Sequence, residues 1–157
     1  MPRFHLLIFA LVAMGLSLFG NGCIEKTLLP AVIITVANVT PYDLVPTSTA
    51  TAQLPSCQVN LTFETLVPTR LQSFSVSYAS KLGQPIPVLR IEETPMEVRF
   101  TGGAAAVTFN PYTAKVVELY ELTSSDISPI IATIRLTFRD ANGNTVQRDA
   151  TCRLFKL

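Results

Sequence analysis

The sequence predicts an all-β protein, a β-sandwich of about seven strands preceded by an N-terminal signal or anchor segment. Short segments alternate apolar and polar residues with the period of two that is typical of half-buried strands. Glycines, prolines and asparagines separate these segments as turn formers do. Hydrophobic residues make up 48% of the chain and charged residues only 15%, a composition that favours a packed core over disorder.

Size and composition limit what the protein can be. The 157 residues suffice for one domain with one core. Twelve Lys and Arg residues balance eleven Asp and Glu residues, so the overall charge predicts no nucleic-acid partner. The one histidine, His5, lies in a segment that we expect to be removed. The mature chain would then contain no imidazole, which rules out Ser-His-Asp and Cys-His catalysis. An all-cysteine zinc site needs four thiolates, and the chain has only three cysteines.

Residues 1–22 have the features of a secretory signal peptide. Arg3 provides a weakly positive start, and residues 6–19 form an unbroken run of apolar and small residues. This run is shorter than the roughly 20 apolar residues that a membrane-spanning helix needs. The alternative is an uncleaved anchor, because a helix from Phe4 to Gly20 could just cross a bilayer.

The signal segment ends at Cys23, inside the stretch LFGNGCIE of residues 18–25. This stretch resembles the lipobox of bacterial lipoproteins, in which small residues precede a cysteine that is acylated and becomes the mature N-terminus. Gly22 fits the position before the cysteine, whereas Gly20 stands where the family usually has leucine. Ordinary signal peptidase is the alternative, since it also requires small residues at these two positions and would leave Cys23 as a free thiol.

The lipobox resemblance implies a protein that is anchored to the membrane by lipid at Cys23 in the bacterial cell envelope. Residues 23–30 would be the lipidated N-terminus and tether. Ile24 follows the cysteine where aspartate would retain a protein at the inner membrane, so by resemblance to enterobacterial lipoproteins the outer membrane is favoured.

Residues 31–157 are expected to form the sandwich domain. Its first segment, residues 31–39, is β-branched and is either the first strand or part of the tether. Residues 40–56 are rich in Pro, Thr and Ser, which predicts an extended connection or a weak edge strand. Residues 57–65 alternate cleanly, with four apolar side chains on one face. These are Cys57, Val59, Leu61 and Phe63.

The middle of the chain continues the strand pattern. Further alternating segments lie at residues 72–78, 96–100 and 105–109, with turns at residues 83–87 and at Gly102-Gly103. Residues 114–122 suit one face of a short helix nearly as well as a strand, so both remain open.

A β-hairpin is predicted at the C-terminus. Residues 130–139 alternate, and the loop Ala141-Asn142-Gly143, with Gly143 at positive φ, would pair Asp140 with Asn144. This register sets Phe138 opposite Val146, Ile134 opposite Ala150 and Ala132 opposite Cys152. A slip by one residue would turn polar side chains towards the core. Arg148 opposite Leu136 is the one mismatch.

The hairpin register makes Cys57 and Cys152 a candidate disulfide. Both face inward, one at the start of an early strand and one near the end of the last. An exported protein favours an even number of paired cysteines, which the pair provides if Cys23 carries lipid. The bond would add about 4 to 5 kcal/mol of stability by restricting the unfolded chain. Two buried free thiols are the alternative.

The strand rhythm of residues 31–157 resembles immunoglobulin-like or fibronectin-type-III-like domains of bacterial envelope proteins. This implies an immunoglobulin-like Greek-key β-sandwich. The chain has no tryptophan and its candidate disulfide involves the last strand, unlike antibody domains. The fold alone carries no functional residues across.

Three further patterns have ordinary structural explanations. Asp140, Asn142 and Asn144 have the spacing that begins a calcium loop, but a hairpin turn explains them better. An acidic cluster with nearby arginines suits a solvated edge strand better than acid–base catalysis. Its members are Glu92, Glu93 and Glu97, near Arg90 and Arg99. The sequons at Asn38 and Asn60 would carry glycans only in a eukaryotic secretory protein.

We therefore expect a non-enzymatic envelope lipoprotein with no catalytic, cofactor or metal site. Its partners would be the membrane, through the N-terminal lipid, and another envelope protein docked on an exposed strand edge or loop set. The alternative is a periplasmic or surface binder that holds a small ligand in a cavity between the sheets.

Overall fold

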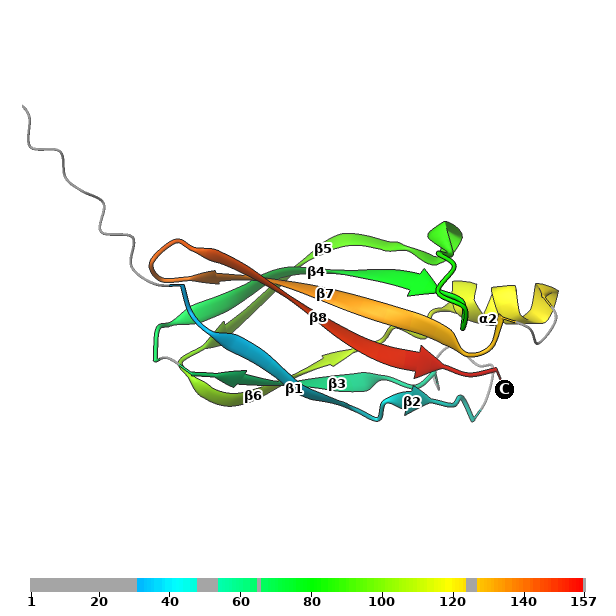
Figure 1. Ribbon diagram of the computed structural model, residues 1–157, viewed down its shortest axis with the longest axis horizontal. Coiled ribbons are helices and arrows are strands. Elements are labelled where there is room, and N and C mark those ends of the chain that lie inside the picture. The colour runs from blue at the N-terminus through cyan, green and yellow to red at the C-terminus, as the bar shows by residue number, and fades with distance from the viewer. Residues whose placement is uncertain (1–30, 48–53, 65, 124–126, 157) are drawn as a thin grey trace, which may run out of the picture.

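Two β-sheets packed face to face form the body of the protein (Figure 1). The computed structural model describes residues 31–47, 54–64, 66–123 and 127–156. The three-stranded sheet has the order β1-β3-β6, and the five-stranded sheet has the order β2-β8-β7-β4-β5. The strands are β1 (Ile34–Thr40), β2 (Asp43–Leu44), β3 (Cys57–Phe63), β4 (Thr69–Ala79), β5 (Ile91–Phe100), β6 (Gly103–Phe109), β7 (Ile130–Asp140) and β8 (Thr145–Leu154). The all-β sandwich class is confirmed.

The N-terminal strand changes sheets part-way along its length. β1 pairs antiparallel with β3, and after Pro41 and Tyr42 the chain continues as β2, which pairs parallel with β8. Asp43 accepts two hydrogen bonds from Arg153, with N–O distances of 2.7 and 2.8 Å, which fasten this short strand. The predicted first strand and weak edge strand are therefore both present, while residues 48–53 lie outside the described part of the chain.

The inner faces of the two sheets meet in one apolar core. The predicted alternation in β3 is confirmed, because Cys57, Val59, Leu61 and Phe63 are all buried. Phe63 stacks on Phe100 with ring centroids 4.9 Å apart, and the edge of Phe138 packs on Phe63 at 6.1 Å. This aromatic cluster joins the three-stranded sheet to the five-stranded sheet.

β4 is longer than its predicted segment and contains an irregularity. Its pairing with β7 shifts between Leu71 and Ser73, so Gln72 is an additional residue on the β4 side. Because of this bulge, Leu71 is fully buried and Phe74 also packs against the core. The alternation predicted for residues 72–78 did not reveal the bulge.

The C-terminal hairpin has the predicted register. Ala132 pairs with Cys152, Ile134 with Ala150 and Phe138 with Val146, within one continuous ladder between β7 and β8. The Asp140 N–H donates to the Asn144 carbonyl at 3.0 Å, and Gly143 has a φ of 86°. Glycine adopts this positive φ without the steric cost that a side chain would add.

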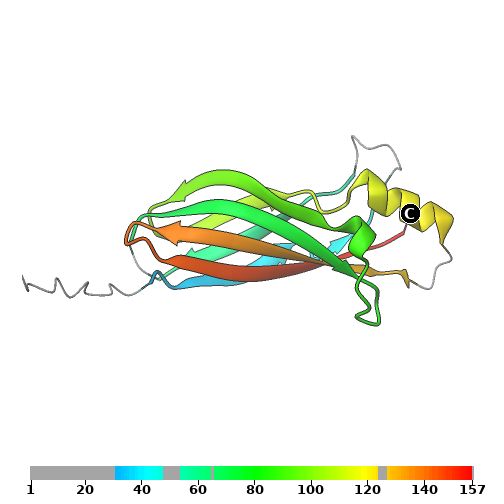
Figure 2. The same cartoon turned by 90° about the horizontal axis from the view of Figure 1, so that it is seen from above.

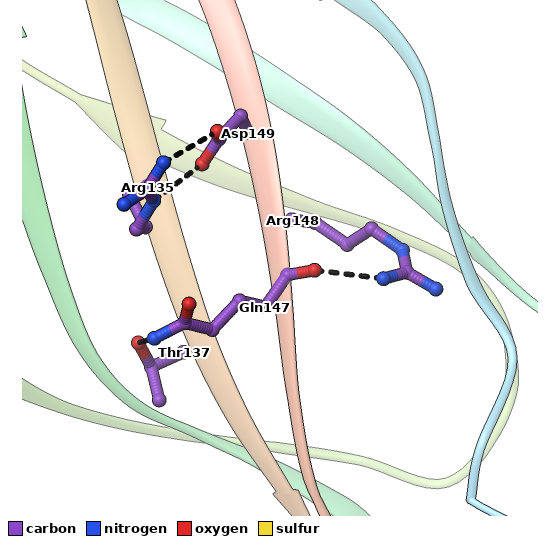
Figure 3. A network of polar contacts seen from close by, with 5 residues as sticks. All are labelled: Arg135, Thr137, Gln147, Arg148 and Asp149. Atoms are coloured by element: carbon purple, nitrogen blue, oxygen red, sulfur yellow. Dashed lines mark hydrogen bonds and ion pairs between the residues drawn. The ribbon is translucent and has the colours of Figure 1, made fainter.

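Arg148 occupies the mismatched position opposite Leu136, and its side chain reaches sideways towards β1 (Figure 3). Its Nε donates a hydrogen bond to the Ile34 carbonyl of β1, and its Nη1 donates to the Gln147 carbonyl at 2.7 Å. The arginine therefore connects β8 of one sheet to β1 of the other. Arg148, which the hairpin pattern leaves as a mismatch, thus closes one side of the sandwich by joining β8 to β1.

A helix, α2 (Ala114–Leu122), connects β6 to β7 and lies at the end of the sandwich opposite the start of β1 (Figure 2). The sequence left helix and strand open here. Val116 and Tyr120, four residues apart, are the buried side chains of one helical face. The Tyr120 hydroxyl donates to the Leu154 carbonyl at 2.6 Å and accepts from the Ile130 N–H at 3.0 Å. These bonds hold the helix against the ends of β7 and β8.

At the end of the sandwich remote from α2, the Asp140 carboxylate holds the β7–β8 loop and the segment before β1 together. Only 5% of the residue is exposed. Its oxygens accept hydrogen bonds from the Asn144 N–H at 2.8 Å, the Asn144 Nδ2 at 3.0 Å and the Val32 N–H at 3.2 Å. Burial raises the pKa of Asp140, but hydrogen bonds from Asn144, Val32 and Asn142 outweigh burial and lower the pKa below its usual value. The turn interpretation of this loop is therefore supported over the calcium loop.

We predict that Asp140→Asn destabilises the protein by about 1.5 to 3 kcal/mol at pH 7, because the amide places a donor against backbone donors. The lowered pKa stabilises the fold above the unfolded pKa of about 3.9, and this contribution disappears as the pH falls through the folded pKa. Urea unfolding at pH 7 and pH 3 should therefore show a smaller pH dependence for the variant than for the wild type. Glu92→Gln, at an exposed position, is the control, and an unchanged pH dependence in Asp140→Asn would contradict the assignment.

Candidate functional site

The outer face of the three-stranded sheet carries no charged side chain among the described residues. Its side chains form three rows across β1, β3 and β6, set by the pairing of the strands. The rows are Thr35, Thr62 and Ala104; Asn38, Asn60 and Ala106; and Thr40, Gln58 and Thr108. All are exposed except Asn60, which is half-buried. We call these nine residues the neutral face.

Hydrogen bonds connect the polar members of the neutral face to one another. The Asn60 Nδ2 donates to the Asn38 Oδ1, and the Thr40 hydroxyl donates to the same oxygen at 3.4 Å. Both sequons noted in the sequence, at Asn38 and Asn60, therefore lie side by side on this face. Because their amides bond to each other, these residues form an ordered and uncharged surface.

The outer face of the five-stranded sheet is different, because ion pairs cross it. Arg135 of β7 donates two hydrogen bonds to Asp149 of β8, both with N–O distances of 2.9 Å (Figure 3). A hydrogen bond from the Arg135 guanidinium lowers the pKa of the Asp149 carboxyl below its usual value. The two faces of the sandwich thus offer a partner quite different chemistry.

The outer edge of β6 is unprotected. β6 pairs with β3 on one side, and its other side pairs with no strand that the structure describes. The strand GAAAVTF contains no charged residue and no proline. Ala104, Ala106 and Thr108 are the outward side chains, and all three are small. Natural proteins usually protect such an edge with charges, prolines or bulges, so an edge without them is available for pairing with another strand.

The other three sheet edges have protection. β2 is only two residues long, and β1 lies against β8 through Arg148. β5 contains Pro95 and the acidic cluster that the sequence predicted for a solvated edge. In this cluster Glu92 pairs with Arg90 at 3.4 Å and Glu97 with Arg99 at 3.5 Å, all at the surface. The edge-strand interpretation of the cluster is supported, and β6 stands apart from the other edges.

Cys57 and Cys152 lie together at the end of the sandwich near α2. Both are buried free thiols in the structure. A hydrogen bond with Cys152 lowers the pKa of the Cys57 thiol, and the same bond, together with burial, raises the pKa of Cys152. Burial, and then the neighbouring Cys152, raise the pKa of Tyr78 above its usual value. Both cysteines face inward, as the alternation of β3 and the hairpin register predict, and the disulfide between them stays a prediction.

The lipidation site, metal ligands and membrane-spanning helices complete the survey of candidate sites. Cys23 and the whole signal segment lie outside the described part of the chain. Within residues 31–47, 54–64, 66–123 and 127–156, no group of three or more His, Cys, Asp or Glu residues is placed to hold a metal ion. Among these same residues there is also no helix of the length and apolarity needed to cross a membrane.

Comparison with known proteins supplies no relative, since neither a family model nor a curated protein matches the chain. Sequence reasoning did not single out the β6 edge. The available signal was the absence of charge throughout residues 101–114, a run that spans β6 and both of its flanking turns. Only the strand order shows that this uncharged run lies at an edge.

We predict that oxidising conditions link Cys57 to Cys152, because both thiols are buried in the same core and interact with each other. Non-reducing peptide mapping should recover the two cysteines in one linked species. Reduction should lower the free energy of unfolding by about 4 to 5 kcal/mol. The single variants Cys57→Ala and Cys152→Ala are the controls for cavity effects. Neither can form the bond, so reductant should leave the free energy of unfolding of each variant unchanged. Alkylation of both thiols in unfolded, unreduced protein would show that the bond is absent.

Proposed function

We propose that this protein is a non-enzymatic lipoprotein of the bacterial cell envelope that binds an extended segment of another envelope protein along β6. The anchor is the acylated Cys23, followed by the tether of residues 23–30. The observation that carries the proposal is the open edge of β6, which is uncharged over its whole length. The outer membrane is the favoured location, on the basis of Ile24.

Addition of a strand to β6 would extend the three-stranded sheet to four strands. Main-chain hydrogen bonds supply the affinity in this mode of recognition, and pockets for alternate side chains supply specificity. The small outward side chains Ala104, Ala106 and Thr108 leave room for larger side chains on the incoming strand. The adjacent neutral face offers no charge with which a charged segment could pair. Uncharged polar and apolar segments are therefore the expected ligands.

A second copy of this chain fits the edge less well than a different protein does. β6 runs along the long axis of the sandwich, and the start of β1 lies at one end of that axis (Figure 1). Antiparallel pairing of β6 with β6 would direct the two N-terminal ends in opposite directions. Two copies anchored through Cys23 in one membrane need both ends to face it, so we commit to a heterologous partner.

The strand order supports an immunoglobulin-like Greek-key topology as part of the proposal. In the three-stranded sheet β3 neighbours β6, and in the five-stranded sheet β4 neighbours β7. The chain therefore crosses between the sheets after β1, β2, β3, β5 and β6. The first strand divides between the sheets and ends parallel to the last strand. α2 then lies in the connection from β6 to β7. Greek-key connections of this kind are typical of such sandwiches.

The alternative function requires a cavity between the sheets for a small ligand. Large side chains occupy the space between the inner faces instead, among them the fully buried Leu61, Ile134 and Phe138. Two hollows among the described residues border β4 and β5, one of them also the end of β7, and both open to solvent. The observations favour the edge over the cavity.

We predict that Ala106→Lys weakens partner binding about fivefold, because a charge on the edge opposes an uncharged incoming strand by about 1 kcal/mol. The measurement is the yield of a photo-crosslinked adduct formed by the full-length protein in membranes of its native bacterium. The crosslinking amino acid replaces Thr108. The matched control is Thr62→Lys, which places the same charge on the neutral face but on the central strand β3.

The outcomes of this experiment separate edge pairing from other contacts. Loss of the adduct in Ala106→Lys but not in Thr62→Lys supports strand addition. Equal loss in both variants would show binding to the neutral face and would contradict the edge. An adduct of twice the mass of the chain would identify a second copy as the occupant and overturn the heterologous partner. Thermal unfolding of both variants checks that each one folds.

We predict that mass spectrometry of the protein from native membranes finds a mature N-terminus at Cys23 with diacyl or triacyl modification. Two or more acyl chains anchor a protein stably, since each buried methylene contributes about 0.8 kcal/mol. Cys23→Ser should abolish acylation and release the protein from the membrane fraction. An unmodified Cys23, or an intact Met1, would reject the lipoprotein assignment. The β6 experiment would still test strand addition, because it does not require acylation.

A further inference from the structure

Three arginines form a row across three adjacent strands of the five-stranded sheet. Arg70 of β4 pairs directly with Arg99 of β5 on one side and with Arg139 of β7 on the other. Residues directly opposite one another on antiparallel strands project from the same face, with Cβ atoms about 4.5 to 5.5 Å apart. All three side chains are exposed, so the three guanidinium groups share the outer face of this sheet.

The arginine row carries an excess of positive charge. Glu97 is the one carboxylate paired with it among the described residues, at 3.9 Å from Arg70 and 3.5 Å from Arg99. Arg139 makes no ion pair and no side-chain hydrogen bond with any residue that the structure describes. Asp140 is adjacent, but the donors of Val32 and Asn144 already occupy its carboxylate.

Protection of a sheet edge does not explain this row. Charges discourage aggregation when they lie on an edge strand, and of the three arginines only Arg99 lies on one. Arg70 and Arg139 belong to interior strands, where like charges placed directly opposite each other are destabilising. The row therefore has an energetic cost that an anionic ligand would relieve.

A hollow of about 500 Å³ lies beside the row and is large enough for a small ligand. The three arginines line it together with Thr101, Gly143 and Asp140, whose carboxylate is already bonded to Val32 and Asn144. Guanidinium groups bind phosphate oxygens through paired, charge-assisted hydrogen bonds. We propose that the arginine row is a binding site for the phosphate group of a phosphorylated small molecule or of a phospholipid.

The position of the site in the molecule is relevant to the source of the phosphate. The hairpin loop between β7 and β8 lies at the same end of the sandwich as the start of β1 (Figure 1). The hydrogen bond from Val32 to Asp140 fixes these two segments together. If the proposed anchor at Cys23 is correct, the row lies at the membrane-proximal end, where a lipid headgroup is within reach. The phosphate site itself does not depend on the anchor.

The test uses the full-length chain in micelles of a neutral detergent at about 0.15 M salt, where long-range attraction is screened. The readout is the NMR signals of the arginine Nε–H groups. One titration adds inorganic phosphate, and a second adds phosphatidylglycerol to the micelles. Saturable shifts of Arg70, Arg99 and Arg139 are expected in at least one titration. Arg139→Gln should weaken binding about tenfold or more, because a charge-assisted bond is lost.

The matched control is Arg90→Gln, which removes an exposed arginine at the other end of β5 and should leave binding unchanged. Shifts with inorganic phosphate alone identify a free phosphate compound as the ligand class, and shifts only with phosphatidylglycerol identify a lipid headgroup. No saturable shift in either titration, or equal weakening in Arg90→Gln and Arg139→Gln, would overturn the proposal. None of these results depends on acylation of Cys23 or on the β6 edge.

Discussion

The hydrogen bonds of the Asp140 carboxylate connect the last hairpin to the start of the domain. The carboxylate closes the loop through Asn144 and accepts the Val32 N–H from the segment before β1. The hairpin therefore has one register, and the N-terminal end is held beside it. From this register follow the inward position of Cys152 and the reach of Arg148 to β1.

The two sheets differ in the chemistry of their outer faces, although they share one core. Cross-strand ion pairs and the arginine row mark the five-stranded sheet, whereas the neutral face of the three-stranded sheet contains only amides, hydroxyls and methyl groups. Protection of edges follows the same division, because β5 has charges and proline while β6 has neither. This difference in edge protection is the basis for proposing β6 as the edge that pairs with a partner.

Local pattern was enough to predict β3, the C-terminal hairpin and the inward position of Cys57 and Cys152, because a period of two and a glycine turn specify these without distant information. The segment of α2 remained ambiguous, since its apolar residues suit two periods and only the contacts of Tyr120 with Leu154 and Ile130 decide between them. The arginine row could not be predicted. Its members are far apart in the sequence, and the pairing of β4 with β5 and β7 aligns them.

β3 is the central strand of the three-stranded sheet, and in the proposed function it connects the partner-binding strand to the strand nearest the tether. It pairs with β1, which leads to the anchor, and with β6, which would receive the partner strand. A force on the partner would therefore pass through β3 to the N-terminal tether without crossing the core. The five-stranded sheet is held to this path by Asp140 and Arg148 at one end and by the contact of Cys57 with Cys152 at the other. If the proposed anchor and disulfide are both present, the disulfide would prevent the sandwich from opening under such a load at the end remote from the anchor.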